Sequence, residues 1–157
     1  MDETLHYDWV HNPPERSLIC HDILSELPDW FGNDAALKDY VEQVYRLPMI
    51  CAYADKQPVG FLAIKEHTPQ AAELCVMGVL EEYHRKGIGR MLVVMAEHYV
   101  MDLGKRFFTV KTLSASHPDR YYQRTRAFYE AMGFVPLEEI PQIWGPDDPC
   151  LIMIKAL

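Results

Sequence analysis

The stretch from Glu73 to Gly104 constrains the fold of this 157-residue chain more than any other part of it. Residues Glu73 to Leu80 alternate as expected of a buried strand, and a short basic turn with two glycines, His84 to Gly89, follows them. Apolar residues then recur at helical spacing from Ile88 to Leu103, and Gly104 is a natural end for that helix. The sequence therefore predicts a strand, a glycine turn and a helix in succession.

The glycine turn has the features of an anion site. A turn that opens a helix presents unpaired backbone N–H groups and the positive end of the helix dipole, and its commonest ligand is phosphate. Gly87 and Gly89 let the backbone come close to the anion. Positive charge is added by three neighbours, Arg85, Lys86 and Arg90. The alternative is an ordinary connection between a strand and a helix, whose basic residues are only solvated.

Two common nucleotide motifs are excluded at this turn. A P-loop needs a Lys-Ser or Lys-Thr pair after its glycines, and none follows here. A Rossmann fingerprint needs a third glycine where Leu92 stands. The turn is therefore expected to hold a phosphate without a Walker lysine or magnesium. This suits a cofactor that is bound through its phosphates and reacts at a different group.

Two blocks of the sequence resemble one enzyme family. The turn H-R-K-G-I-G, His84 to Gly89, resembles the Q/R-x-x-G-x-G/A loop with which the GNAT N-acetyltransferase superfamily binds the pyrophosphate of acetyl-CoA. His84 replaces Gln or Arg, at a position that contributes mainly its backbone. T-R-A-F-Y-E-A-M-G-F, Thr125 to Phe134, is similar to the late helix and strand of that family. The blocks occur in the family's order and cover roughly the C-terminal half of the chain.

Periodicity elsewhere in the chain predicts the remaining elements. Further strands are expected at Leu5–Val10, Met49–Ala54, Val59–Glu66, Arg106–Leu113, Phe134–Glu139 and Cys150–Lys155. Further helices are expected from about Glu15 to Leu27, from Asn33 to Tyr45 and from Asp119 to Met132. The order β-α-α-β-β-β-α-β-α-β-β indicates an α/β (mixed α+β) protein with one central mixed sheet of about six to seven strands and about four flanking helices. The resemblance implies the same arrangement, as a single GNAT-like domain over residues 1–157.

Charge and cysteine content narrow the class of protein. The net charge of −8 argues against nucleic acid as the main partner and is compatible with a cationic acceptor. The alternative is that the negative charge only keeps the protein soluble. No apolar run approaches the roughly 20 residues of a membrane span, and the acidic N-terminus lacks a signal-peptide core. The 4 cysteines are widely spaced and form no C-x-x-C pair, which predicts a reducing cytoplasm without disulfides or a zinc site.

Acetyl transfer to an amine requires a base, because only the neutral amine attacks a thioester. Glu73 is the predicted base, since its strand places it on one face with Cys75 and Met77, and apolar neighbours make a carboxylate a better proton acceptor. The triplet A-E-L, thirteen residues before Lys86, also resembles the position of the catalytic glutamate in the histone-acetyltransferase branch of the family. The alternative is that Glu73 opens the strand and is exposed. His117, in a loop, is a second candidate, although a loop histidine is more often solvated.

Tyr129 is the predicted acid. By resemblance it occupies the position of the tyrosine that often protonates the coenzyme A thiolate in the family. A phenol suits this role, because it is protonated at neutral pH and can hydrogen-bond to sulfur. The alternative is that Phe128, Tyr129 and Met132 form an apolar helix stripe in which Tyr129 only packs.

The resemblance also implies the residues that contact acetyl-CoA, or a related acyl-CoA. Gly78 and Val79 would pair their backbone with the pantetheine amides, as an added strand pairs with a sheet edge, and the alternative for Gly78 is a β-bulge. The other implied contacts are His84, Arg85, Lys86, Gly87, Ile88, Gly89, Arg90, Tyr122 and Phe128. Tyr122 departs from the asparagine that is common at its position. No metal is expected, because the histidines show no ligand spacing.

The break L-P-D-W-F-G, Leu27 to Gly32, is the predicted acceptor site. Asp29 would draw in a protonated amine, Trp30 would add a cation–π contact, and Phe31 would line the cleft. In GNAT proteins the connection between the first two helices commonly borders the acceptor, so the resemblance favours a cleft. The alternative is that Trp30 and Phe31 seal the loop onto the core.

These observations predict a cytoplasmic N-acetyltransferase that moves an acetyl group from acetyl-CoA directly to a primary amine of a small molecule, such as a polyamine, an aminoglycoside or an amino-acid-like compound. A lysine or N-terminal amine of a peptide or protein is a second class of acceptor. The alternative from another class is a non-catalytic coenzyme-A-binding regulatory module, against which the presence of both Glu73 and Tyr129 argues. The amine substrate is the expected partner, with no nucleic acid and no membrane, and a homodimer is left open.

Overall fold

The computed structural model describes residues 4–157 of the chain. Its strands are β1 (Leu5–Trp9), β2 (Met49–Ala54), β3 (Gln57–Glu66), β4 (Ala71–Val79), β5 (Phe107–Leu113), β6 (Val135–Ile140) and β7 (Cys150–Ala156). Its helices are α1 (Pro13–Ser25), α2 (Pro28–Phe31), α3 (Asp34–Val44), α4 (Ile88–Asp102) and α5 (Arg120–Ala131), with one 3-10 turn, η1 (Glu81–Tyr83). The predicted succession is confirmed, and a one-turn helix, α2, is added inside the break that follows Leu27.

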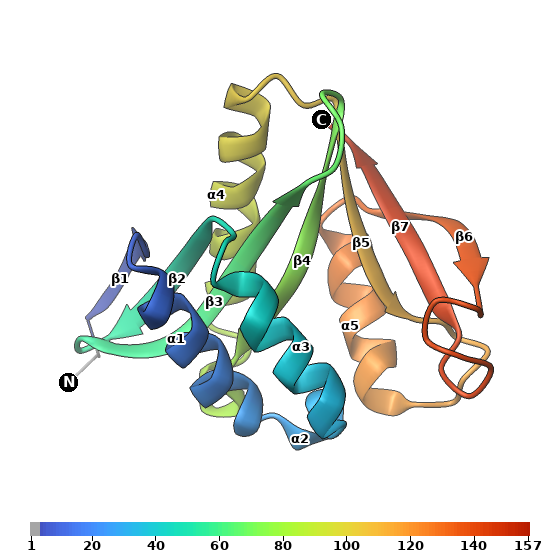
Figure 1. Ribbon diagram of the computed structural model, residues 1–157, viewed down its shortest axis with the longest axis horizontal. Coiled ribbons are helices and arrows are strands. Elements are labelled where there is room, and N and C mark those ends of the chain that lie inside the picture. The colour runs from blue at the N-terminus through green and yellow to red at the C-terminus, as the bar shows by residue number, and fades with distance from the viewer. Residues whose placement is uncertain (1–3) are drawn as a thin grey trace. The chain divides into compact units, whose positions relative to one another are not determined.

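The seven strands form one mixed sheet in the order β1-β2-β3-β4-β5-β7-β6 (Figure 1). β1 pairs antiparallel with β2 and β2 with β3, whereas β4 and β5 run parallel, with Ala71–Leu74 opposite Phe107–Val110. β7 pairs antiparallel with both β5 and β6. The mixed α/β class and the central mixed sheet are therefore confirmed. Among the described residues, no helix is long and apolar enough to cross a membrane.

The β2–β3 hairpin turns more tightly than the sequence indicates. A four-residue turn, Asp55 to Pro58, is predicted, but β3 already begins at Gln57. Asp55 and Lys56 alone make the turn, with φ angles of +48° and +73°. Two consecutive residues in the left-handed region match the twist of the flanking strands, which is why a two-residue connection suffices.

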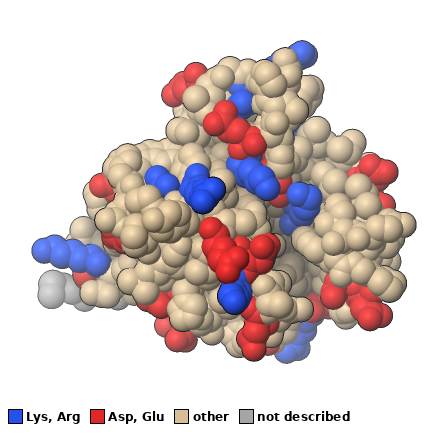
Figure 2. Space-filling model, viewed as in Figure 1, with Lys and Arg blue, Asp and Glu red and all other residues tan. Residues whose placement is uncertain are grey.

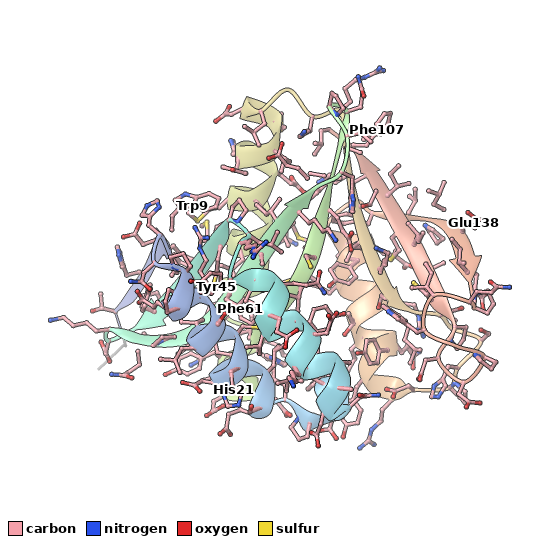
Figure 3. All side chains as sticks on the ribbon, in the orientation of Figure 1. Trp9, His21, Tyr45, Phe61, Phe107 and Glu138 are labelled. Carbon is pink, nitrogen blue, oxygen red and sulfur yellow. The ribbon has the colours of Figure 1, made fainter. Side chains whose placement is uncertain are left out.

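The chain divides into two compact units. The first consists of the chain up to Lys65 together with Cys75–Tyr99. In this unit α1 and α3 lie side by side over β2 and β3 (Figure 1), and Phe61 of β3 is buried in the core that they share (Figure 3). Asparagine side chains cap both helices, Asn12 for α1 and Asn33 for α3.

The second unit consists of Glu66–Leu74 and Val100–Leu157. Helix α5 packs against β5, and the rings of Phe108 and Phe134 in its core have centroids 5.8 Å apart. β5, β7 and β6 run side by side in this unit (Figure 1). The single domain expected over residues 1–157 stays a prediction.

Candidate active site

The residues between η1 and α4 in the first unit, together with the first turn of α4, are named here the basic loop, residues 84–90. Gly87 has a φ of +79°, a conformation that side chains rarely adopt, so the glycine is required. Arg85 also has a positive φ, +64°, and nothing in the sequence indicates this strained position. Gly89 lies in the first turn of α4 and has no positive φ, so its backbone conformation does not require a glycine.

The amides at the start of α4 point out of the end of the helix. The first bond of this turn runs from the N–H of Met91 to the carbonyl of Gly87, 3.1 Å, so the N–H groups of residues 87–90 precede the helical ladder. A Cβ built on Gly87 would meet no atom within 4 Å, so the backbone is open to a ligand there. Arg85, Lys86 and Arg90 are exposed. These features fit the pyrophosphate that the sequence predicts.

The side chain of His84 makes a hydrogen bond within the protein, and its backbone contact with the coenzyme stays a prediction. Its Nε2 lies 2.7 Å from the carbonyl oxygen of Val79, so the ring donates a hydrogen bond that ties the end of β4 to the basic loop. The ring of Trp30 meets the ring of His84 edge to face, with centroids 5.8 Å apart. Helix α2 therefore lies beside the basic loop, a proximity that no local sequence pattern shows.

The glycine at position 78 is explained by packing. A Cβ there would lie 3.0 to 3.2 Å from side-chain atoms of Leu24, Ile23 and Leu27. Gly78 thus lets α1 approach β4 closely within the first unit. The pairing of Gly78 and Val79 with pantetheine stays a prediction. It is compatible with the bond from His84, because a carbonyl oxygen has two lone pairs.

In the second unit, three side chains form a group named here the carboxylate cluster: His67, Glu73 and Lys111. Glu73 is only 5% exposed and lies inside β4, which begins at Ala71, so the alternative of an exposed residue opening the strand is wrong. The Nζ of Lys111 donates to both carboxylate oxygens, at 3.1 and 3.2 Å. His67 Nε2 lies 2.6 Å from the Oε1 atom of Glu73. Glu73 is therefore a buried anion with two partners.

Tyr129 is 7% exposed, and its ring lies 5.6 Å from that of Phe128 and 5.8 Å from that of Phe134. Burial raises the pKa of Tyr129, so its phenol keeps its proton at neutral pH, as an acid must. The packing alternative is equally consistent with this burial. Burial, with the nearby charge of Asp119, also raises the pKa of Tyr122 to about 12.

The residues predicted for the acceptor all lie on α2. Asp29 is exposed, whereas Trp30 and Phe31 are half-buried and pack against the apolar core of the first unit. Both rings therefore cover part of the core, which is the role that the alternative gives them. Acidic side chains gather over the next helix, α3 (Figure 2). They are the exposed residues Asp34, Asp39 and Glu42.

A separate concavity of about 400 Å³ lies in the first unit. Its lining consists of Trp9, Val10, His11, Arg16, Arg46, Pro48, Met49 and Tyr99. None of the residues predicted for the acceptor or the coenzyme contributes to it.

The sequence profile of the acetyltransferase (GNAT) domain matches residues 46–136, more than half of this chain. The chain belongs to the GNAT family. An uncharacterized N-acetyltransferase of Chlorobaculum tepidum is 35% identical to it over 139 residues, a match that covers 80% of this chain and 83% of that protein. The basic loop, Glu73 and Tyr129 all lie within the residues that the family profile matches.

Solved structures share the fold of this GNAT protein. One from Desulfovibrio desulfuricans, described as an acetyltransferase of the GNAT family, superposes with a TM-score of 0.81 at 18% identity, covering 98% of this chain and 99% of that one. The PaiA N-acetyltransferase of Thermoplasma acidophilum, solved in complex with coenzyme A, gives a TM-score of 0.73 at 17% identity, covering 97% and 99%. At these identities the likeness establishes the fold.

Membership of the GNAT family makes this chain an acyl-CoA-dependent N-acyltransferase. The predicted family, fold and enzyme class are therefore confirmed. Within residues 4–157, no group of three or more His, Cys, Asp or Glu side chains is placed to hold a metal ion.

Proposed function

We propose that this GNAT acetyltransferase moves an acetyl group from acetyl-CoA directly to the primary amine of a small molecule. The observation that carries the proposal is the basic loop, in which a left-handed Gly87 and open amides at the start of α4 suit a pyrophosphate. The coenzyme A bound to the Thermoplasma acidophilum protein supports the same cofactor here.

In this proposal, backbone amides make most of the contacts with the coenzyme. The amides of residues 87–90 take the pyrophosphate, and the exposed charges of Arg85 and Lys86 add an attraction that salt screens. We assign the remaining contacts, as the family resemblance implies, to Gly78, Val79, His84, Tyr122 and Phe128.

The proton transfers are assigned to the carboxylate cluster and to Tyr129. An ordinary alkyl ammonium costs about 4 kcal/mol to deprotonate at pH 7, so a base is useful, and we place it in the cluster around Glu73. Tyr129 would protonate the departing thiolate, because burial keeps its phenol in the protonated form. Tyr129→Phe should therefore lower kcat more than it weakens coenzyme binding, and the reverse result would assign Tyr129 to binding.

The amine is proposed to bind at α2, beside the basic loop. Exposed Asp29 and the acidic side chains over α3 create a negative potential that attracts a protonated amine, and Trp30 and Phe31 offer apolar surface to its carbon atoms. Asp29→Asn should raise the KM for the amine and leave the KM for acetyl-CoA nearly unchanged. Trp30→Ala should do the same less cleanly, because Trp30 also contacts His84. A folded Asp29→Asn enzyme with an unaltered amine KM would rule this site out.

Thermal unfolding with added ligands tests the coenzyme assignment. Acetyl-CoA at 100 times its Kd should stabilise the chain by about 2.7 kcal/mol, coenzyme A should act similarly, and ATP at the same concentration should do less. Turnover of acetyl-CoA is then measured against polyamines, aminoglycosides, amino-acid-like amines and lysine peptides. Equal stabilisation by ATP would contradict the coenzyme assignment. Stabilisation without turnover of any amine would indicate the regulatory module, and turnover of peptides alone would indicate a protein acceptor.

A further inference from the structure

The separate concavity of the first unit has a fixed cation in its wall. Arg16, near the start of α1, donates from Nε to the carbonyl of Val10 at 2.7 Å and from Nη1 to the carbonyl of Tyr45 at 3.3 Å. These bonds hold the plane of the guanidinium but do not neutralise it, because a carbonyl group carries no net charge. The N–H groups of Nη2 bond to none of residues 4–157 and are available to a ligand.

Two further basic side chains line the same concavity. Arg46 follows Tyr45, His11 follows Val10, and both are exposed. Each comes directly after a residue whose carbonyl holds Arg16, so the three side chains lie on one wall. Basic side chains gather over the end of α3 (Figure 2). Among residues 4–157, no carboxylate pairs with Arg16 or Arg46, so their charge is left for an anion from outside.

This positive wall differs in sign from the chain as a whole, whose net charge is −8. At 0.15 M salt the screening length is about 8 Å, so an anion in the concavity responds to the arginines that line it more than to distant carboxylates. A protonated amine is repelled there for the same reason. The concavity therefore suits an anion and does not suit the amine that accepts the acetyl group.

Apolar side chains form the rest of the lining. Trp9 ends β1 (Figure 3), and its ring lies against that of Tyr99 of α4, with centroids 4.8 Å apart and planes inclined by 44°. Both residues are half-buried, so part of each is open to a ligand. Pro48 and the buried Met49 complete this side, and the N–H of Val10 donates to the carbonyl of Met49 at 2.9 Å. A flat apolar ring can therefore pack against this surface.

Volume and lining together define a class of ligand. The volume of about 400 Å³ lies within the roughly 300–1,000 Å³ of small-molecule sites. A guanidinium fork matches the two oxygens of a carboxylate. We infer that this concavity is a second binding site, for a small planar organic acid whose ring packs against Trp9 and Tyr99 and whose carboxylate meets Arg16 and Arg46. The inference does not rest on the proposed function, because none of these residues is assigned to acetyl-CoA or to the amine.

The tryptophan signals locate the ligand. The chain has 3 tryptophans, Trp9, Trp30 and Trp144, and each gives one indole N–H signal in a nitrogen-15 NMR spectrum. Trp9→Phe identifies the signal of Trp9. Titration with indole-3-acetate should shift that signal to saturation and leave the other two in place. A shift of Trp30 alone would put the acid at α2, and equal shifts of all three would mean unspecific adsorption. Either result, or no saturable shift, would overturn the inference.

Two analogues separate the ring from the charge. Indole-3-acetamide keeps the ring and has no charge, whereas acetate keeps the charge and has no ring. Each should bind at least about tenfold more weakly than indole-3-acetate. Raising the salt concentration from 0.15 M to 1 M should weaken the acid and leave the amide unchanged, because the screening length falls to about 3 Å. Equal affinities of the acid and the amide would contradict the role of the arginines.

Substitutions in the wall test the arginines one at a time. Arg46→Gln removes an exposed charge and leaves the bonds of Arg16 intact, so it should fold normally and raise the Kd for indole-3-acetate about threefold. Arg16→Gln removes the fixed guanidinium and should raise that Kd about tenfold or more. Lys38→Gln removes an exposed charge of α3 outside the concavity and is the matched control, with a change below about twofold.

The melting temperature of each variant is measured alongside its Kd. If Arg16→Gln does not fold, Arg46→Gln decides alone. A wild-type Kd in every folded variant would overturn the inference.

Competition with acetyl-CoA distinguishes this site from the proposed active site. No residue of the basic loop lines the concavity, so saturating acetyl-CoA should leave the Kd for indole-3-acetate within about twofold of its value without the coenzyme. Loss of indole-3-acetate binding under saturating acetyl-CoA would mean that the acid occupies the coenzyme site. That result would overturn the inference and leave the proposed function intact, whereas a failure to bind acetyl-CoA would refute the proposed function and leave this site unaffected.

Discussion

The basic loop and the carboxylate cluster are built in opposite ways. The basic loop is local, because residues 84–90 are consecutive and their anion site consists of backbone amides and left-handed turns. The carboxylate cluster is long-range, because the side chains of His67, Glu73 and Lys111 come from a turn and two strands. The loop should therefore respond to changes in backbone conformation and tolerate changes of side chain, whereas the cluster should do the reverse.

The largest predicted effect comes from the cluster. Lys111→Met keeps the length of the side chain and removes its charge, so the buried carboxylate of Glu73 loses its counter-ion. Breaking a fully buried ion pair costs about 3–5 kcal/mol. Since the side chain of Lys111 is 34% exposed, we expect the free energy of unfolding to fall by about 1–3 kcal/mol, as measured by urea denaturation.

Two further variants test whether this loss of stability is caused by the missing charge. Lys38→Met removes an exposed lysine of α3 and should cost less than about 0.5 kcal/mol. The double variant Lys111→Met with Glu73→Gln should be more stable than the sum of the two single changes, because it no longer buries an unpaired anion. If Lys111→Met is as mild as Lys38→Met, charge does not hold the cluster together, and the contrast with the basic loop fails.

The same contrast explains how much of the molecule the sequence predicts. The basic loop is predictable because its glycines, its charges and the start of α4 are neighbours in the chain. The succession of strands and helices follows from local periodicity in the same way. By contrast, the partners of Glu73 are 6 residues before it and 38 residues after it, and only the turn and the sheet register bring them together.

The structural reason for a glycine also depends on packing, and local sequence patterns do not reveal packing. Gly78 is predicted to contact the coenzyme, which stays a prediction, and the structure adds a packing role, because side chains of α1 and Leu27 fill the space that a Cβ would need. Gly87 and Gly89 are predicted to act alike, but only Gly87 has a positive φ, and Gly89 lies within α4. The strain at Arg85 has no sequence signal at all, because the residue type does not suggest a positive φ.

The next largest effect separates backbone strain from coenzyme binding. Gly87 and Gly104 have nearly the same φ, +79° and +83°, and a Cβ at either would meet no atom within 4 Å. Alanine at either position should therefore cost about 1 kcal/mol of folding free energy, or a few degrees in Tm. Only Gly87→Ala should weaken acetyl-CoA binding, by about tenfold, as measured by titration calorimetry. Equal affinities in the two variants would mean that the basic loop does not bind the pyrophosphate.

The smallest effect concerns the charges of the basic loop. Lys86→Gln removes one positive charge without changing the conformation of the backbone, and Arg85→Gly removes one while relieving the strain of its positive φ. Arg85→Gly should thus gain up to about 0.5 kcal/mol in folding free energy, and Lys86→Gln should change it little. Urea denaturation of the two variants measures this difference.

Both variants should bind acetyl-CoA less than about threefold more weakly near 0.15 M salt, because exposed charges are screened there. The small loss should disappear at 1 M salt, where the screening length falls to about 3 Å, while the loss in Gly87→Ala should persist. This persistence follows because the amides of residues 87–90 act by hydrogen bonds at contact distance, which salt screens little. A tenfold loss in Lys86→Gln would instead mean that a side chain dominates binding. The basic loop and the carboxylate cluster would then work by the same principle, and the distinction between them would not hold.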